Sequence, residues 1–179
     1  MSRHLLAALL PPGSVEAEVG RFQREIFSRH GLVSAIALPP LVPVAFLPEA
    51  GLRRGLLQEL NALAAAPYRI TIGALAWNAG ALYLGVDSAG LWQQLRESAL
   101  ARVPSEPAGL FPVREGFFLG CEEPPVDAQD PVRPHLADSG FTSSSLGLLR
   151  LSTARPPAAW WRDVRWEIAE DIPLRGRRA

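Results

Sequence analysis

Two stretches of the chain repeat the same order of structural signals, and this repetition constrains the fold more than any other feature. The apolar run His4–Leu10 meets Pro11-Pro12-Gly13 and is followed by apolar residues at helical spacing from Val15 to Ile26. Ala81–Val86 meets the turn Asp87–Gly90 and a second amphipathic segment. Short apolar runs that end in turn residues predict buried strands, and a 3.6-residue period predicts helices. The sequence therefore predicts two similar strand–turn–helix units.

The remaining segments extend this pattern to an α+β protein. Ser14 is expected to cap the first helix, and Gly31 is expected to end it. Asp87 or Ser88 is expected to cap the helix that follows the second unit. Pro43 lies inside a strand segment, which favours an edge position or a bulge because proline cannot donate to a sheet. Further strands are expected at 42–47, 68–77, 117–120, 141–152 and 164–172, further helices at 52–65 and 89–102, and a short turn or helix at Trp160-Trp161.

The two units also suggest how the chain is organised in space. Each is followed later by a proline-led strand, at 39–44 in the first half and at 134–138 in the second. We expect a single two-lobed domain over residues 1–179, with pseudo-repeat halves 1–77 and 78–179. Its fold class is predicted as two mostly antiparallel sheets with outer helices and a central cleft, where one strand from each half would form a site.

Composition excludes several classes of protein. Hydrophobic residues make up 48% of the 179 residues and charged residues 20%, which favours a folded domain over disorder. The chain has no apolar run long enough to span a bilayer and no signal-peptide pattern, so we expect no membrane partner and a cytoplasmic location. The formal net charge is zero, which argues against duplex DNA as a partner. Cys121, the single cysteine, rules out an internal disulfide.

Every one of the 18 basic residues other than histidine is an arginine. A P-loop needs a lysine for its phosphates, and Schiff-base chemistry needs a lysine amine. Nucleotide transfer through a lysine, as in ATP-dependent nucleic-acid ligases, is excluded for the same reason. The three histidines, His4, His30 and His135, do not follow any spacing typical of a metal site, so we expect neither a metal nor a cofactor.

Three segments carry a resemblance to a known superfamily: Arg3–Pro11, Leu38–Leu47 and Val132–His135. With the helices between them, they resemble the two-histidine phosphoesterases, which include bacterial 2'-5' RNA ligase-like proteins and RNA 2',3'-cyclic phosphodiesterases. The resemblance implies a bilobal LigT-like fold and a cleft that takes a nucleotide or an RNA terminus. It also implies two copies of a His-x-Thr motif, in which the histidines exchange protons and the hydroxyls donate to the phosphate.

The chain departs from that motif at three of its four catalytic positions. In the first copy, Leu41 stands at the histidine position and Pro43 at the threonine position. In the second copy, His135 is retained, but Ala137 stands at the threonine position. Leucine cannot transfer a proton, and neither proline nor alanine has a side-chain donor. The resemblance therefore implies a catalytically impaired member in which His135 is the one remaining catalytic candidate.

Other residues are weaker candidates for binding. Arg133 and Arg150 flank the expected second motif strand and could contact a phosphate. His4 could stand near the cleft, although packing at a strand end is the more common role for such a histidine. Trp160-Trp161 could stack a base if one ring is exposed. Asp138 could orient His135, but a solvated acidic loop is the more common explanation for the nearby carboxylates.

The sequence leaves three functions open. The first is a degenerate 2'-5' RNA ligase-like protein that binds a nucleotide or RNA end without efficient turnover. The second is an active cyclic phosphodiesterase that uses His135 with unrecognised partners. The third is a scaffold or interaction protein that keeps only the fold. The sequence does not fix the oligomeric state.

Overall fold

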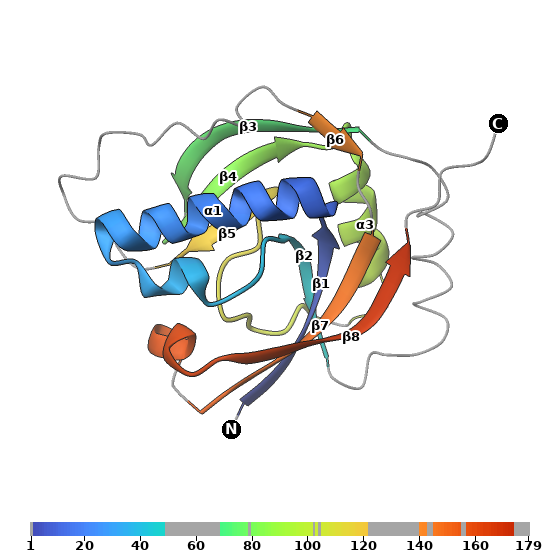
Figure 1. Cartoon of the computed structure of the whole chain (residues 1–179). Helices are drawn as coiled ribbons and strands as arrows, with labels where there is room; N and C mark the ends of the chain where they lie inside the picture. Colours follow the sequence, from blue (N-terminus) through green and yellow to red (C-terminus); the bar gives the residue numbers. More distant parts are fainter. Residues whose placement is uncertain are drawn as a thin grey trace.

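Two antiparallel sheets of four strands each form the frame of the molecule (Figure 1). The computed structural model describes residues 2–48, 69–78, 80–101, 103, 105–121, 140–142, 145–154 and 157–173. The sheets are drawn from both halves of the sequence, because a strand from the first half joins the second sheet and two strands from the second half join the first. The predicted α+β fold with two mostly antiparallel sheets is confirmed.

The first sheet has the order β2-β1-β7-β8. Its strands are β1 (Ser2–Leu10), β2 (Val42–Leu47), β7 (Ser145–Thr153) and β8 (Arg165–Pro173). β1 lies centrally and is buried on both faces from Leu5 to Leu9, which explains its unbroken apolar run. β2 is an edge strand, and its register with β1 shifts between Ala7 and Ala8, opposite Pro43. Both the edge position and the irregularity expected from Pro43 are therefore confirmed.

The second sheet has the order β5-β4-β3-β6. Its strands are β3 (Arg69–Asn78), β4 (Ala81–Asp87), β5 (Gly116–Gly120) and β6 (Gly140–Thr142). The sequence predicted a single strand over 141–152, which is wrong, because this stretch contributes β6 to one sheet and β7 to the other. A continuous β-forming sequence predicts extended structure, but it does not show with which neighbouring strand each part will pair.

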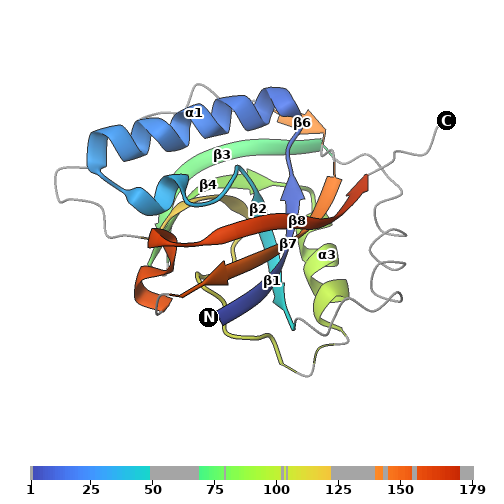
Figure 2. The same ribbon diagram turned by 60° about the horizontal axis from the view of Figure 1, so that its bottom comes forward.

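Helix α1 (Gly13–His30) crosses the frame near both sheets, and α3 (Leu91–Leu100) lies beside β2 (Figure 2). Gly31 ends α1 in the left-handed region with φ of 70°, as expected. The Ser14 cap is wrong, because α1 already begins at Gly13, with Pro12 at the N-cap and no side-chain cap. The expected cap of α3 at Asp87 or Ser88 is also wrong, because Gly90 is the N-cap, although the Ser88 Oγ accepts the Trp92 N–H at 3.0 Å.

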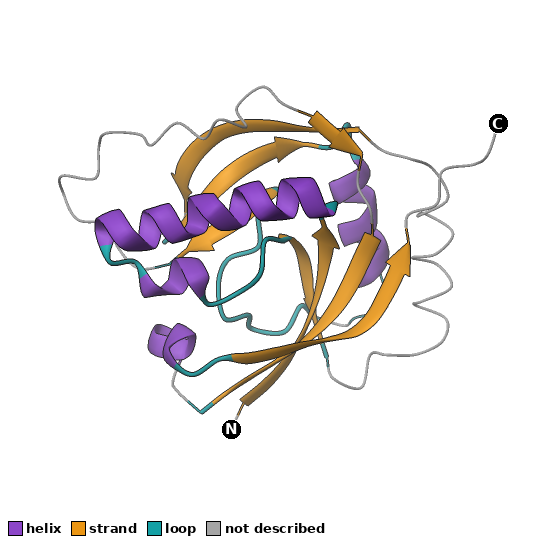
Figure 3. Cartoon of the chain, in the orientation of Figure 1, coloured by secondary structure: helices purple, strands orange, loops and turns teal. Residues whose placement is uncertain are grey.

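Short 3-10 helices complete the described part of the fold, and coil segments lie between the sheets (Figure 3). They are η1 (Val33–Ile36) and η3 (Pro157–Arg162), and the second contains the predicted short helix or turn at Trp160-Trp161. The helix expected at 52–65 lies outside the described residues. Buried residues gather in two clusters, one that joins α1 and α3 to the sheets and one between the sheets.

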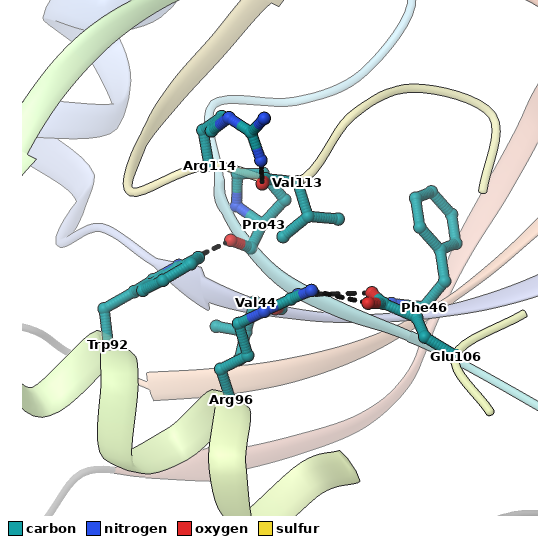
Figure 4. Close-up of polar contacts among 8 residues, drawn as sticks. All are labelled: Pro43, Val44, Phe46, Trp92, Arg96, Glu106, Val113 and Arg114. Atoms are coloured by element: carbon teal, nitrogen blue, oxygen red, sulfur yellow. Dashed lines mark hydrogen bonds and ion pairs between the residues drawn. The ribbon is translucent and has the colours of Figure 1, made fainter. Parts of the chain in front are cut away.

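Side chains from outside the sheet form hydrogen bonds with backbone groups at the free edge of β2 (Figure 4). Trp92 Nε1 donates to the Pro43 carbonyl at 2.7 Å, and Arg96 Nη1 donates to the Val44 carbonyl at 2.6 Å. Glu106 pairs with Arg96 at 2.5 Å and accepts the Phe46 N–H at 3.4 Å. An edge strand normally offers such groups to another chain. Here α3 and the segment after it close that edge.

We expect Arg96→Ala to lower the free energy of unfolding by about 1–3 kcal/mol, because the Val44 carbonyl loses its side-chain donor and the Glu106 carboxylate loses its ion-pair partner. Urea unfolding followed by circular dichroism would measure the loss. Arg21→Ala serves as the control, since Arg21 is exposed on α1 and lies 4.0 Å from Glu18; its effect should stay within about 0.5 kcal/mol. Equal effects of the two variants would contradict the role of Arg96.

Candidate functional site

Pro43 on β2 and Leu41, the residue just before β2, face the space between the sheets. Pro43 is opposite Ala8, and both Ala8 and Leu41 belong to the cluster of buried residues between the sheets. Leu41 is 0% exposed. Residues two apart on an extended chain share a face, so both positions of the expected first motif point into the space between the sheets, which we call the groove. The structure thus places them together, but neither carries a group that could transfer a proton or donate a hydrogen bond.

The second sheet has a strand whose place matches that of β2. β2 is the edge strand next to β1 and is reached from β1 through α1 and η1. β5 is the edge strand next to β4 and is reached from β4 through α3. The two strands also meet, since the Phe118 N–H donates to the Leu41 carbonyl at 3.2 Å. β2 and β5 are therefore topological counterparts that flank the groove.

The groove face of β5 carries Gly116 and Phe118. Phe118 pairs with Tyr83, and Gly116 pairs with Gly85, without a register shift between them. Phe118 and Tyr83 both belong to the cluster between the sheets. A Cβ at Gly116 would lie 2.8 Å from the Leu84 carbonyl oxygen, so any side chain there would require the backbone to move. This strand was missed as part of the site, although Pro112 precedes it much as Pro39-Pro40 precede β2.

Aromatic rings fill the space between β2 and β5. Phe111, from the coil before β5, stacks on Phe118 with ring centroids 4.2 Å apart and lies 5.5 Å from Trp160. Phe46 meets Phe111 edge-on at 5.2 Å. Trp160 is 0% exposed, and its indole N–H has no acceptor among the described residues, a local cost that the surrounding aromatic burial offsets. A pocket of about 300 Å³ remains at one end of the groove, beside Phe46, Arg96 and Arg114.

Two titratable side chains border this cluster. The Tyr83 hydroxyl donates to the Pro112 carbonyl, and burial raises the pKa of Tyr83 far above its usual value of 10. The phenol is therefore protonated at neutral pH and cannot act as a base. His4 lies edge-on to Phe46 with ring centroids 6.0 Å apart, and burial lowers its pKa. His4 therefore lies at the edge of this cluster, near the expected cleft, and packs on Phe46 there.

The other residues expected from the sequence are distributed differently. His135, Arg133 and Ala137 lie outside the described residues, as does Asp138. Arg150 lies on β7 between Leu149 and Leu151, which face the groove cluster, so its own side chain points to the opposite face of the sheet. There it pairs with Glu167 at 3.0 Å. Trp160 is buried and Trp161 is half-buried.

Neither a metal-ligand cluster nor a membrane-spanning helix is found among the described residues. Among residues 2–48, 69–121 with its gaps, and 140–173 with its gaps, histidine, cysteine and carboxylate side chains form no cluster of three that could hold a metal ion. Within the same residues, no helix combines the length and the hydropathy that a bilayer crossing requires.

Solved structures share this architecture over nearly the whole chain. E. coli LigT complexed with 3'-AMP aligns at 17% identity over 96% of this chain and 98% of its own, with a TM-score of 0.63. The chain has the LigT fold. A protein of Thermus thermophilus, TT0787, aligns at 17% identity over 97% of this chain and 99% of its own, with a TM-score of 0.67. A structure described as a phosphoesterase aligns with a TM-score of 0.62, at 17% identity over 97% and 99% of the two chains.

The resemblance to the two-histidine phosphoesterases is therefore confirmed at the level of the fold. No protein-family model and no curated protein sequence matches the chain. At 17% identity, the LigT-like fold alone is shared, and the chemistry has to be argued from this chain's own residues.

Proposed function

We propose that this LigT-like protein acts by binding and does not turn over phosphoesters. The observation that carries this proposal is the burial of Leu41, 0% exposed, in an apolar cluster with Phe111, Phe118 and Trp160. A cyclic phosphate must enter a polar groove and meet an acid and a base there. In this chain, side chains that exclude water occupy that space.

The counterpart strands support the same conclusion. We assign Gly116 and Phe118 as the counterparts of Leu41 and Pro43. β5 occupies the same edge position in the second sheet that β2 occupies in the first. With Leu41 and Pro43, this leaves four groove positions without an ionisable side chain or a donor. Tyr83 is held protonated by burial, and His4 packs against Phe46. A single imidazole contributes only about 100- to 10,000-fold, so little residual rate is expected from His4 alone.

The test is incubation of the purified chain with a nucleoside 2',3'-cyclic phosphate, followed by chromatography of the products. We expect no turnover above the uncatalysed rate. The alternative of an active phosphodiesterase predicts turnover that is lost in His135→Ala, with His30→Ala as the matched control, since His30 ends α1. Turnover that survives in the control and disappears in His135→Ala would overturn our proposal.

A nucleotide or an RNA terminus is the ligand class that the fold suggests. E. coli LigT has been seen in complex with 3'-AMP and with ATP. In this chain, a nucleotide in the groove would have to use the open end of about 300 Å³ beside Arg96 and Arg114, a volume at the lower limit of small-molecule sites. Titration with 3'-AMP, compared between the parent chain and Arg114→Gln, tests this location.

A further inference from the structure

The described part of the chain closes one edge of the first sheet and leaves the other edge open. At the β2 edge, side chains of α3 and of the segment after it form hydrogen bonds with the backbone. The opposite edge is β8, the outermost strand of this sheet in Figure 1, which is exposed along most of its length. Among the described residues, no neighbour binds the outer backbone groups of β8. Unpaired N–H and C=O groups along an edge can pair with a strand of another chain.

Two large apolar side chains project from the first half of β8. Trp166 is 44% exposed and Ile168 is 47% exposed. They pair with Leu151 and Leu149, which belong to the buried cluster between the sheets, so both point to the groove side of the first sheet. The apolar surface of that cluster therefore continues to the rim of the sheet, where it meets solvent.

The charges of β8 change sign along the strand. Arg165 begins the strand, Glu170 and Asp171 lie near its end, and all three side chains are exposed. Glu167, between them, pairs with Arg150 on β7 at 3.0 Å. Parallel pairing with an identical strand would set like charges side by side, whereas antiparallel pairing would set opposite charges together. The charge pattern of β8 is therefore complementary to itself in the antiparallel direction.

A register shift in β8 determines which of these charges share a face of the sheet. The shift lies between Leu148 and Leu149 on β7, so β8 has one extra residue there, as in a β-bulge. Arg165 pairs with Ser152 and Glu170 pairs with Leu148, so their side chains point to the same face although they are an odd number of positions apart. An arginine and a carboxylate are thus presented on one face, at opposite ends of the strand.

We propose that β8 docks on β8 of a second copy of this chain, as an antiparallel pair that joins the two first sheets into one continuous sheet. A two-fold axis at Ile168 sets this residue opposite its own equivalent. The same axis sets Arg165 opposite Asp171 of the second copy and beside Glu170, and it does so twice. Trp166 then lies diagonally across from Ile168 of the second copy, a separation of about 7–8 Å that an aromatic ring can reach. The proposal does not depend on the absence of turnover in the groove.

The test is sedimentation velocity of the full chain over a wide range of concentration. We expect the sedimentation coefficient to rise from that of a monomer toward that of a dimer, at high concentration because an interface of one strand is small. Ile168→Lys should weaken dimerisation at least about tenfold, since it sets two like charges opposite each other at the two-fold axis. Ile36→Lys is the matched control: Ile36 lies on η1 and is 45% exposed, so this variant should dimerise as the parent chain does.

Charge variants test the direction of the pairing. Arg165→Glu should weaken self-association, and so should the double variant Glu170→Arg with Asp171→Arg. A mixture of the two should associate again, because each strand then meets opposite charges on its partner. The changed residues are exposed, so the variants should fold, which circular dichroism would confirm.

Three results would overturn the proposal. The first is a parent chain that stays monomeric at the highest concentration. The second is a dimer that Ile168→Lys leaves intact, because its interface would then lie elsewhere. The third is a mixture of the two charge variants that associates no better than either variant alone, because β8 would then not pair in the antiparallel direction.

Discussion

Phe111→Ala should lower the free energy of unfolding by about 3–5 kcal/mol, the range for truncating a buried aromatic side chain. Phe111 comes from coil, yet it is 6% exposed and touches three other rings of the groove, those of Phe46, Phe118 and Trp160. Each contact would be lost at once, and the surrounding strands are too constrained to collapse fully. Urea unfolding, followed by tryptophan fluorescence and by circular dichroism, would measure the change.

The matched control for this variant is Phe111→Leu, which keeps an apolar side chain and should cost clearly less. A further sign of a true cavity would be a rise in the melting temperature of Phe111→Ala on addition of benzene, because dry apolar cavities accept such molecules. A loss below about 1 kcal/mol for Phe111→Ala would mean that the coil before β5 does not fill the groove, and the argument for lost access would fail with it.

Leu41→His, the change that would restore the first motif histidine, should destabilise the protein by about 2–4 kcal/mol and should not create activity. The imidazole would enter a site that is 0% exposed and lined by apolar side chains, where a polar group lacks a partner and the shape is wrong. Leu41→Met, which conserves volume, should cost less than about 1.5 kcal/mol. Urea midpoints of the two variants give the comparison.

The cost of this histidine should grow as the solution becomes acidic. Burial lowers the pKa of a histidine in the folded state, so the unfolded state binds more protons near pH 6. Stability should therefore fall as the pH drops through about 6.5, the unfolded value, and the Leu41→Met variant should lack this added dependence. A variant that unfolds at the parent midpoint, or that hydrolyses a cyclic phosphate, would show that the groove is open to water.

Strands and helices were predictable where one physical rule dominated. Val42–Leu47 was expected as a strand and is one with those bounds, and Pro43 correctly indicated an edge. Gly31 correctly ended α1, because glycine adopts the left-handed region at little cost. The expected split between two sheets also followed from the repeated strand–turn–helix units. The strand bounds and the helix stop depend on local propensity, which the sequence shows directly.

The site was harder to predict, because it depends on contacts between distant segments. His135, the catalytic candidate, lies outside the described residues, and the described strand that contacts Leu41 is β5, through Phe118. Its place became evident only when the order of strands in both sheets was known. The tryptophan pair shows the same limit, since burial of Trp160 depends on Phe111 and Phe118. Arg150 lies on the opposite face from the groove, and strand alternation could reveal this only once the register was known.

The pairing of β1 has a consequence for synthesis on the ribosome. Ser2 pairs with Thr153, so β1 meets its β7 partner only after the residues up to Thr153 have been translated. β3, β4 and β5 lie within residues 69–120 and can pair much earlier. Until β7 emerges, the apolar stretch from Leu5 to Leu9 lacks one of its neighbours. Until then β1 is an apolar strand that lacks one of its partners, and it is the segment that a holding chaperone would shield.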